Sequence, residues 1–221
     1  RMGKGNEALL HPYVDSKGNF GKAYSRDMAF AAPRYTEVKL TPICQELFAD
    51  LDRDAVDMVD SYDGRMKEPT LLPVSFPSIL VNSNVGIAVG MASSICPFNL
   101  AEVCETAAAL IRDPAHPVES TLKGPDFPIG GQILYDPVEL RKVYETGRGA
   151  IRVRSRYRYD KDANCIEITE IPPTTTVEAI IDKVVELVKG GRAREIADVR
   201  DETDLSGLKL TIDCKRGTDP D

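Results

Sequence analysis

The stretch Ala31-Ala-Pro-Arg-Tyr-Thr-Glu-Val-Lys-Leu40 places an arginine, Arg34, directly before a tyrosine, Tyr35. A phenol is a weak nucleophile while it keeps its proton. A guanidinium beside it favours the phenolate and can also hold an anionic phosphate. The pair is therefore chemically suited to attack a phosphodiester and form a covalent tyrosyl-phosphate. The dipeptide alone is a weak signal, because it fits an ordinary half-buried surface pair equally well.

The residues behind Tyr35 carry a helical pattern. The apolar residues that recur at near-helical spacing are Val38, Ile43, Leu47 and Leu51. Thr36 could cap such a helix, but Pro42 would then lie inside it, where proline costs about 3 kcal/mol. Thr41 as the cap, with Pro42 at the first helical position, is less strained. A helix kinked at Pro42 reconciles the two alternatives.

Composition limits the class of protein. The chain has 221 residues, enough for one or two domains, and its 42% hydrophobic content predicts a real core. The net charge of −7 argues against a freestanding nucleic-acid binder, so any DNA contact needs local basic patches or a larger assembly. The five cysteines form no CxxC pair, which favours reduced thiols over disulfides or zinc. No apolar run approaches the ~18 residues of a membrane span.

Two stretches allow competing interpretations. From Gly149 to Tyr159 apolar and basic residues alternate with period two, which predicts one strand with arginines on one face: Arg152, Arg154, Arg156 and Arg158. That face is either a phosphate-contacting stripe or an exposed strand balanced by acidic neighbours. The stretch from Asn82 to Ala92 is apolar and contains two glycines, which on periodicity alone favours a buried strand.

Three further segments carry local signals. The segment from Gly18 to Gly21 reads as a turn. The acidic run at 50–67 does not follow an EF-hand pattern, so we interpret it as a solvated helix end leading to a turn at Gly64, and we predict no metal site. The proline-rich residues 68–80 read as an extended connection and the end of a first domain.

The second half of the chain predicts an α+β fold. Helices are expected at 100–112, capped by Asn99 and with Ile111 on the apolar face, at 138–144, closed by Gly147, and at 177–189. Strands are expected at 165–171 and 208–214, with a polar loop at 198–204. Strand pairs with an intervening helix indicate an α+β layer.

Six motifs follow in an order that resembles the A subunit of bacterial type IIA DNA topoisomerases, that is, DNA gyrase and topoisomerase IV. They are Gly18-Asn-Phe-Gly21, Ala31-Ala-Pro-Arg-Tyr-Thr-Glu37, Val59-Asp-Ser-Tyr-Asp-Gly64, Gly86-Ile-Ala-Val-Gly-Met-Ala92, Gly124-Pro-Asp-Phe-Pro128 and Thr146-Gly-Arg-Gly149. The resemblance covers almost the whole chain. Phe98 is a departure, because the family often has histidine there, and we assign it no role.

The resemblance implies a DNA breakage-reunion function. Residues 1–80 would be a partial winged-helix domain with the catalytic tyrosine, and residues 81–221 the tower domain. Tyr35 would attack a DNA phosphate to leave a 5′-phosphotyrosyl link, and Arg34 would stabilise the transition state. Ile87 would wedge between base steps and bend the duplex. The residues expected to contact phosphate or sugar are Asn82, Lys39, Asn19, Arg154 and Arg156.

The resemblance also implies partners and cofactors. Mg²⁺ and ATP would both be bound by a partner B subunit, and neither by this chain. The A subunit would dimerise and join two B subunits in a bacterial, cytoplasmic, nucleoid-associated complex without a membrane component. The helix-turn-helix portion would precede Arg1, and the coiled coil and DNA-wrapping domain would follow Asp221, so this chain alone should be inactive.

Two alternatives stand beside the enzyme. The first is a non-catalytic DNA-binding or scaffolding module in which Tyr35 is structural. The second is a plain α+β interaction domain with no nucleic-acid role. A tyrosine hydroxyl buried in a dry interior would exclude the enzyme hypothesis.

Overall fold

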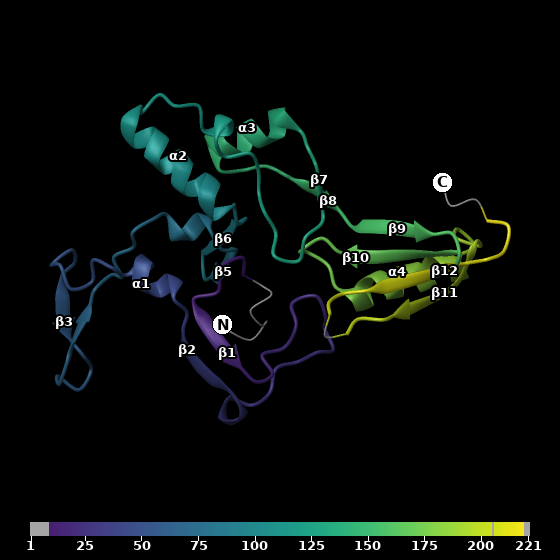
Figure 1. Ribbon diagram of the computed structural model, residues 1–221, viewed down its shortest axis with the longest axis horizontal. Helices are drawn as coiled ribbons and strands as arrows, with labels where there is room; N and C mark the ends of the chain where they lie inside the picture. The colour runs from purple at the N-terminus through teal and green to yellow at the C-terminus, as the bar shows by residue number, and fades with distance from the viewer. Residues whose placement is uncertain (1–8, 205, 219–221) are drawn as a thin grey trace. The chain divides into compact units, whose positions relative to one another are not determined.

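The computed structural model describes residues 9–204 and 206–218 (Figure 1). The chain divides into two compact units. Among the described residues, unit 1 comprises 19–31 and everything from Phe127 onward, and unit 2 comprises 9–18 and 32–126. The chain therefore leaves unit 2 after Gly18 and re-enters it at Ala32. The domain limits at 1–80 and 81–221 stay a prediction.

The elements are short, and strands outnumber helices among them. The helices are α1 (Ile43–Leu47), α2 (Leu100–Arg112), α3 (Pro137–Thr146) and α4 (Val177–Lys189), with 3₁₀ turns at Pro33–Tyr35, Ser78–Leu80 and Val118–Ser120. The strands are β1 (Val14–Lys17), β2 (Glu37–Leu40), β3 (Met58–Asp60), β4 (Lys67–Pro69), β5 (Asn84–Ala88), β6 (Met91–Ile95), β7 (Gln132–Leu134), β8 (Arg152–Arg154), β9 (Arg156–Asp160), β10 (Cys165–Glu170), β11 (Ile196–Asp201) and β12 (Leu210–Cys214). The predicted α+β class is confirmed. None of the described helices is both long and apolar enough to cross a membrane.

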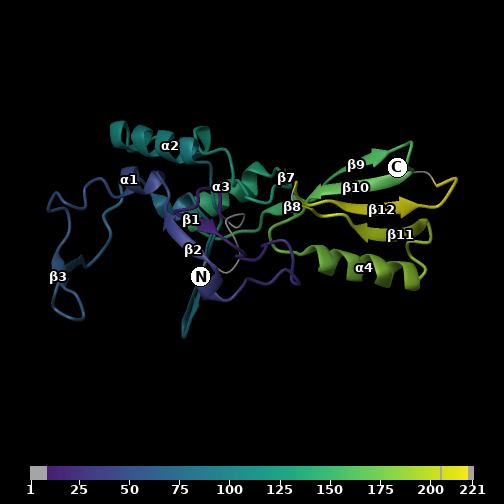
Figure 2. The ribbon, with the colours of Figure 1, turned by 60° about the horizontal axis from the view of Figure 1, so that its bottom comes forward.

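Unit 1 is built on a four-stranded antiparallel sheet in the order β11-β12-β10-β9. Helix α4 runs along one face of this sheet (Figure 2). Because strand side chains alternate between faces, the apolar residues Ile168, Leu210 and Ile212 share the covered face and pack with Val177 of α4. Tyr24, from the segment 19–31, is buried in the same core.

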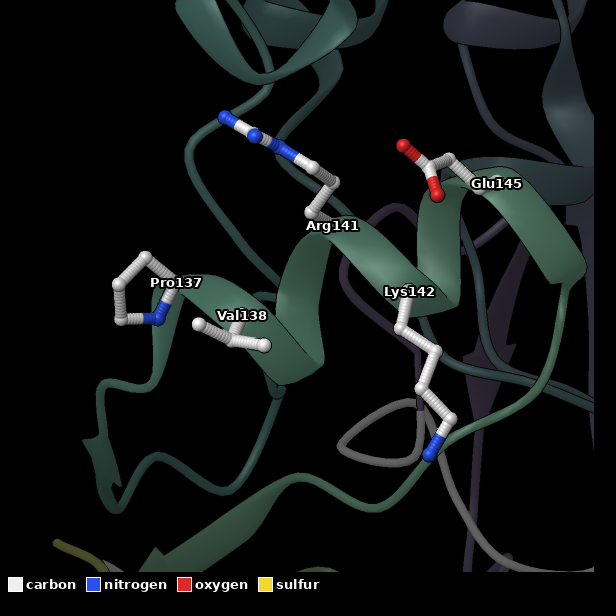
Figure 3. Close-up of a pocket in the computed structure, with 5 residues that line it drawn as sticks. All are labelled: Pro137, Val138, Arg141, Lys142 and Glu145. Atoms are coloured by element: carbon white, nitrogen blue, oxygen red, sulfur yellow. The ribbon is translucent and has the colours of Figure 1, made fainter.

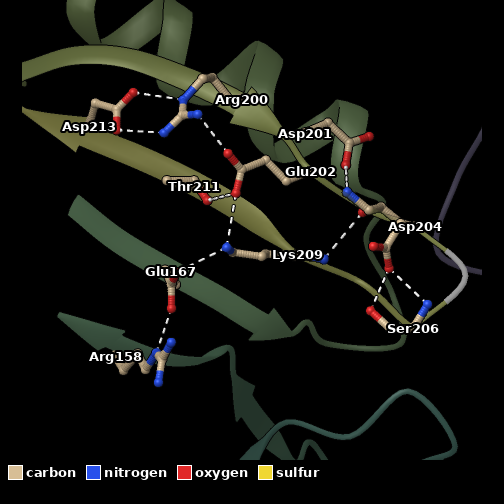
Figure 4. A network of polar contacts seen from close by, with 11 residues as sticks. Arg158, Glu167, Arg200, Asp201, Glu202, Asp204, Ser206, Lys209, Thr211 and Asp213 are labelled. Atoms are coloured by element: carbon tan, nitrogen blue, oxygen red, sulfur yellow. Dashed lines mark hydrogen bonds and ion pairs between the residues drawn. The ribbon is translucent and has the colours of Figure 1, made fainter. Parts of the chain in front are cut away.

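The other sheet face carries a row of charged residues that pair across the strands (Figure 4). Glu167 accepts a hydrogen bond from Arg158 and lies 3.0 Å from the Nζ of Lys209, which also lies 3.0 Å from Glu202. Arg200 continues the row by pairing with Glu202 and, through two hydrogen bonds, with Asp213. Fully partnered charges of this kind can cross a sheet face without an unpaired group.

The predicted arginine strand is wrong as a single element. It divides at Ser155 into β8 and β9, and these strands belong to different sheets, since β8 pairs with β7 and β9 with β10. The predicted loop at 198–204 is also wrong in part, because Ile196–Asp201 is strand β11. A register shift between Ile196 and Asp198 breaks the alternation that sequence reasoning looks for.

Unit 2 consists of three β-hairpins with helices α1 and α2. The prediction of a helix starting at Thr36 is wrong, because Glu37–Leu40 is strand β2, paired with β1. The alternative start near Pro42 is confirmed, but the helix stops at Leu47. Residues of the acidic run, expected to end a helix, instead form the β3–β4 hairpin around Gly64. Non-local strand pairing overrides the weak helical pattern here.

The helix ends predicted at Asn99 and Gly147 are confirmed. Asn99 accepts hydrogen bonds from the backbone of Ala101 and Glu102 at the start of α2. Helix α3 ends at Gly147, which has the left-handed φ of 68° that suits glycine. The assignment of Ile111 to the apolar face of α2 is wrong, since this side chain is 84% exposed.

Candidate functional site

Arg34 and Tyr35 lie in an exposed 3₁₀ turn of unit 2. Pro33 begins the turn, and the amides of Tyr35 and Thr36 donate hydrogen bonds to the carbonyls of Ala32 and Pro33, at 3.0 and 3.1 Å. Tyr35 is 66% exposed, so its phenol is open to a large substrate. The Arg34 guanidinium carbon lies 4.7 Å from the centroid of the Tyr35 ring, a cation–π contact. The two side chains are therefore already associated in the free protein.

The β1–β2 hairpin holds this turn from one side. Lys17 and Glu37 are register partners at the end of the ladder, and their side chains form an ion pair at 3.1 Å. Gly18 follows with φ of +109°, and a Cβ placed on it would lie only 2.9 Å from the Tyr35 carbonyl oxygen. Glycine is thus required where the backbone passes close to the tyrosine. The sequence predicted the turn at Gly18 but not its close contact with the Tyr35 carbonyl oxygen.

Lys39 lies on β2, four residues beyond the tyrosine. Its Nζ is 3.4 Å from Asp15 on β1, and both side chains are largely exposed. An exposed ion pair is weak and easily exchanged for another anion. Lys39 therefore remains free to meet a phosphate, but from a strand and not from the helix that the sequence predicted.

Asn19, predicted to contact a phosphate, belongs to unit 1, and its side chain is used within its own loop. Its amide nitrogen donates to the carbonyl of Ala29, at 3.1 Å, and its amide oxygen accepts from the amide of Gly21, at 2.9 Å. Its backbone carbonyl accepts from the amide of Ala31, at 2.9 Å. These three hydrogen bonds give Asn19 a loop-closing role.

Ile87 projects from the β5–β6 hairpin. It is 89% exposed, and other apolar residues of the same hairpin are exposed with it: Val85, Val89 and Met91. A single buried strand, which periodicity favoured, is therefore wrong. Gly90 has φ of +78° and makes the turn between the two strands. An exposed apolar hairpin is suited to insertion into another molecule.

Asn82 lies just before this hairpin and is only 7% exposed. Its amide oxygen accepts from the backbone amide of His11 at 2.9 Å, and its amide nitrogen donates to the His11 carbonyl at 2.8 Å. The side chain thus joins the base of the hairpin to residue 11. Its predicted contact with phosphate or sugar has no support from this geometry.

Arg154 and Arg156 lie in unit 1 on different strands. The Arg154 Nε donates to the amide oxygen of Gln132 at 3.0 Å, and Arg156 forms an ion pair with Glu170 at 3.1 Å. Arg158 is paired with Glu167 in the charged row. The acidic neighbours proposed as an alternative are therefore present for Arg156 and Arg158, whereas Arg154 is bound to a neutral partner.

The part of the chain that the structure describes holds no group of three or more His, Cys, Asp or Glu side chains placed to bind a metal ion. A shallow depression runs along α3 and is lined by Pro137, Val138, Arg141, Lys142 and Glu145 (Figure 3). All of these residues come from one helix, so no second element contributes chemistry there. The depression differs in this respect from a concave catalytic pocket.

The site residues thus fall into two groups by unit. Unit 2 carries Arg34, Tyr35, Lys39, Asn82 and Ile87, and unit 1 carries Asn19, Arg154 and Arg156. Sequence reasoning did not identify the close contact between Gly18 and Tyr35 or the exposed hairpin partners of Ile87. The paired glycines at 86 and 90 were the available signal for a hairpin, but their spacing does not identify the turn.

Comparison with known proteins agrees with the motif order. The family model of the DNA gyrase/topoisomerase IV A subunit matches residues 1–221. The chain is 39% identical over 217 residues to the DNA gyrase A subunit of Haloquadratum walsbyi, covering 97% of this chain and 25% of that protein. It is 42% identical over 219 residues to the DNA gyrase A subunit of Streptomyces coelicolor, covering 95% and 25%. The chain thus spans about a quarter of the length of these relatives.

Proposed function

Because the chain belongs to the family of the DNA gyrase/topoisomerase IV A subunit, we propose that it carries the DNA-cleaving nucleophile of a type IIA topoisomerase. In this proposal Tyr35 attacks a backbone phosphate. The Tyr35 hydroxyl gives up its proton as its oxygen forms a bond to phosphorus, the bond from phosphorus to the sugar 3′ oxygen breaks, and that oxygen takes up a proton. Reversal of the step reseals the strand after a second duplex has passed.

The single observation that carries the proposal is the exposed Arg34–Tyr35 turn. A phenol that is 66% exposed can reach the phosphate of a duplex, which a buried tyrosine could not. The guanidinium carbon lies 4.7 Å from the ring centroid, so a cation is available near any phosphate that this tyrosine attacks. A preplaced cation of this kind stabilises a transition state without reorganisation during the reaction.

In this proposal the B subunit binds both Mg²⁺ and ATP. The part of the chain that the structure describes places no three His, Cys, Asp or Glu side chains where they could together hold a metal ion. We therefore assign the ligands of Mg²⁺, together with the ATP site, to a B subunit. When bound, Mg²⁺ would stabilise charge on the leaving and non-bridging oxygens.

The proposed assembly is a heterotetramer of two A and two B subunits acting on double-stranded DNA in the cytoplasm, with the change in supercoiling or linkage driven by ATP. Residues 1–80 would form part of a winged-helix domain and residues 81–221 the tower domain. Isolated from the partner and from the rest of its own subunit, the chain would lack the metal and would not cleave.

Mapping the covalent adduct tests the proposal. The full-length A subunit with its B partner is mixed with end-labelled duplex and Mg²⁺, then denatured and digested. We expect the phosphate-modified peptide to contain Tyr35. An adduct on another residue, or no adduct from an active preparation, contradicts the assignment.

A second prediction concerns Ile87. We expect Ile87→Ala to reduce DNA bending in the complex, because an apolar wedge offsets the few kcal/mol needed to unstack a base step. The end-to-end distance of a dye-labelled duplex, measured by energy transfer, should increase towards that of free DNA.

The matched control for the wedge is Ile111→Ala, since Ile111 is 84% exposed on α2. It makes the same truncation at an exposed isoleucine of unit 2 and should leave bending at the wild-type value. Unchanged bending in Ile87→Ala would exclude the wedge role. Equal loss in both variants would indicate a nonspecific effect and would exclude it too.

A third prediction separates the two arginines of the tower region. Arg154→Gln should lower the slope of log affinity against log salt by about 0.9, the value for one lost phosphate contact. Arg156→Gln should lower it less, because Glu170 already neutralises that guanidinium at 3.1 Å. Lys183→Gln on α4, whose lysine is paired with Glu186, is the control. A slope unaltered by both arginine variants contradicts DNA contact at these strands.

A further inference from the structure

The β5–β6 hairpin of unit 2, which we call the wedge hairpin, is exposed along its length. Every residue of β5 is exposed, and so are the first four residues of β6. The two strands pair from Asn84 and Ile95 at the base to Ala88 and Met91 at the turn. A two-stranded hairpin by itself is only marginally stable in water. The position of the wedge hairpin in unit 2 therefore depends on the contacts at its base.

The base of the wedge hairpin is buried on both sides. Val81 and Asn82 precede β5 and are 0% and 7% exposed. Pro97 and Phe98 follow β6 and are also buried. The amide of Phe98 donates to the carbonyl of Leu80 at 2.8 Å, which closes the base. Asn82 is thus a buried polar side chain at the point where an exposed hairpin joins its unit.

Asn82 attaches this base to a distant part of the same unit. Its amide oxygen accepts from the backbone amide of His11 at 2.9 Å, and its amide nitrogen donates to the His11 carbonyl at 2.8 Å. One side chain thus binds both backbone groups of a residue 71 positions away. This pairing requires a donor and an acceptor on one side chain, which a carboxylate or an apolar group lacks. Burial strengthens both hydrogen bonds, because little water competes for them.

The residues that follow His11 are fixed in turn. Thr41, directly after β2, donates its hydroxyl to the Pro12 carbonyl at 2.8 Å and its amide to the Tyr13 carbonyl at 3.1 Å. The Cys44 thiol donates to the same Tyr13 carbonyl at 3.2 Å. Burial raises the pKa of the Tyr13 phenol, so this group adds no charge at neutral pH. Segment 11–13 is therefore held by the β1–β2 hairpin and α1, and it can support the wedge hairpin.

We infer that Asn82 is a positioning residue for Ile87: its two hydrogen bonds to His11 fix the base of the wedge hairpin on segment 11–13, and so fix where the isoleucine meets the duplex. This inference rests on the proposed wedge role of Ile87. An apolar wedge must enter at one base step to offset the cost of unstacking it. A hairpin that moves on its base would spread the isoleucine over several positions. Asn82 acts through the backbone and touches no DNA.

The test measures DNA bending by energy transfer, using the full-length A subunit, its B partner and a duplex with a dye at each end. Asn82→Ala removes both hydrogen bonds to His11. We expect a broader distribution of end-to-end distances, with a mean shifted from the wild-type value towards that of Ile87→Ala. Asn82→Asp should not restore bending, because an ionised carboxylate cannot donate to the His11 carbonyl. Wild-type bending in Asn82→Ala would overturn the positioning role, with or without a loss of DNA affinity.

Combining Asn82→Ala with Ile87→Ala separates positioning from a general loss of structure. If Asn82 acts through Ile87, the double variant should bend DNA as Ile87→Ala does, because the side chain to be positioned is absent. A further loss of bending in the double variant would show that Asn82 acts by another route, and would overturn the inference. Wild-type bending in Ile87→Ala would refute the proposed wedge itself, not only the role of Asn82.

Thr106→Ala is the matched control. Thr106 is 6% exposed on α2 in the same unit, and its hydroxyl contacts the Glu102 carbonyl at 2.7 Å and the Thr121 hydroxyl at 2.8 Å. The substitution therefore also removes a buried polar group with two hydrogen-bonding contacts, but away from the wedge hairpin. We expect a lower melting temperature with wild-type bending. Equal losses of bending in Thr106→Ala and Asn82→Ala would show that bending depends on overall stability, and would overturn the inference.

Hydrogen exchange provides a second measurement that needs no DNA. In Asn82→Ala we expect faster exchange at the amide of Phe98, which closes the base of the wedge hairpin, as well as at the amide of His11. The amides in the middle of α2 should exchange at the wild-type rate, because the loosening is local. Faster exchange at His11 alone would show that Asn82 does not hold the base, and would overturn the inference.

Discussion

Tyr35→Phe is expected to lower covalent DNA attachment by at least about 10³-fold, because the variant lacks the oxygen that we propose forms the bond to phosphorus. The side chain is 66% exposed, so loss of its hydroxyl should leave the free energy of unfolding within about 0.5 kcal/mol of wild type. DNA affinity should also be retained, since the ring and its arginine neighbour remain. The measurement is the fraction of labelled duplex that stays with the protein after denaturation.

Tyr62→Phe is the matched control for this experiment. Tyr62 is fully exposed at the turn of the β3–β4 hairpin in the same unit, so the substitution removes an equally accessible phenol. Wild-type attachment in Tyr62→Phe together with loss in Tyr35→Phe would tie the chemistry to one hydroxyl. Retained attachment in Tyr35→Phe would instead favour a non-catalytic DNA-binding module, the first alternative that the sequence allows.

The longer helices α2, α3 and α4 could be predicted because their signals are local. Asn99 binds two amides of the first turn of α2, and Gly147 ends α3 in a left-handed conformation. Thr176 likewise accepts from the amide of Ala179 at the start of α4. A cap depends on residues two or three positions away, so a window of sequence contains the whole interaction.

Strand partners could not be predicted in the same way. Glu37–Leu40 carries part of a helical pattern, but it is a strand because β1, far back in the chain, satisfies its backbone. The arginine run reads as one strand, but β7 and β10 pair with its two halves separately. Pairing over such separations is a property of the fold and leaves little trace in local periodicity.

At the candidate site, too, interactions between distant residues could not be predicted from local sequence. Residue chemistry and motif order predicted the Arg34–Tyr35 pair as a candidate site. Tyr35 is exposed, and its role stays a prediction. The amides of Asn19 and Asn82 could not be interpreted without the structure, because their partners are backbone groups of Ala29 and His11. A polar residue in a motif can serve the fold as readily as a ligand, and only its hydrogen-bond partners distinguish the two roles.

Arg34→Ala is expected to lower the rate constant of DNA cleavage at saturating DNA by about 10²- to 10³-fold, the usual effect of removing one preplaced group that stabilises transition-state charge. The guanidinium carbon lies 4.7 Å from the Tyr35 ring centroid, so the cation is beside the proposed nucleophile before DNA binds. Arg34→Lys should recover only part of the rate. Lysine keeps the charge, but it loses the planar fork that binds two phosphate oxygens and stacks on the ring.

Chemical rescue separates transition-state stabilisation from a general loss of positive charge. Added guanidinium ion, at concentrations that leave the protein folded, should raise the cleavage rate of Arg34→Ala and have no effect on Tyr35→Phe, which lacks the nucleophile. Arg65→Ala removes an exposed arginine of the β3–β4 hairpin that pairs only weakly with Asp63, and it should cleave at the wild-type rate. Equal losses of rate in Arg34→Ala and Arg65→Ala would show that the effect depends on net charge. A wild-type rate in Arg34→Ala would show that Arg34 takes no part in the reaction. Rescue confined to Arg34→Ala would place the guanidinium at the reacting phosphate, because only a group that acts there can be replaced by a free ion of the same chemistry.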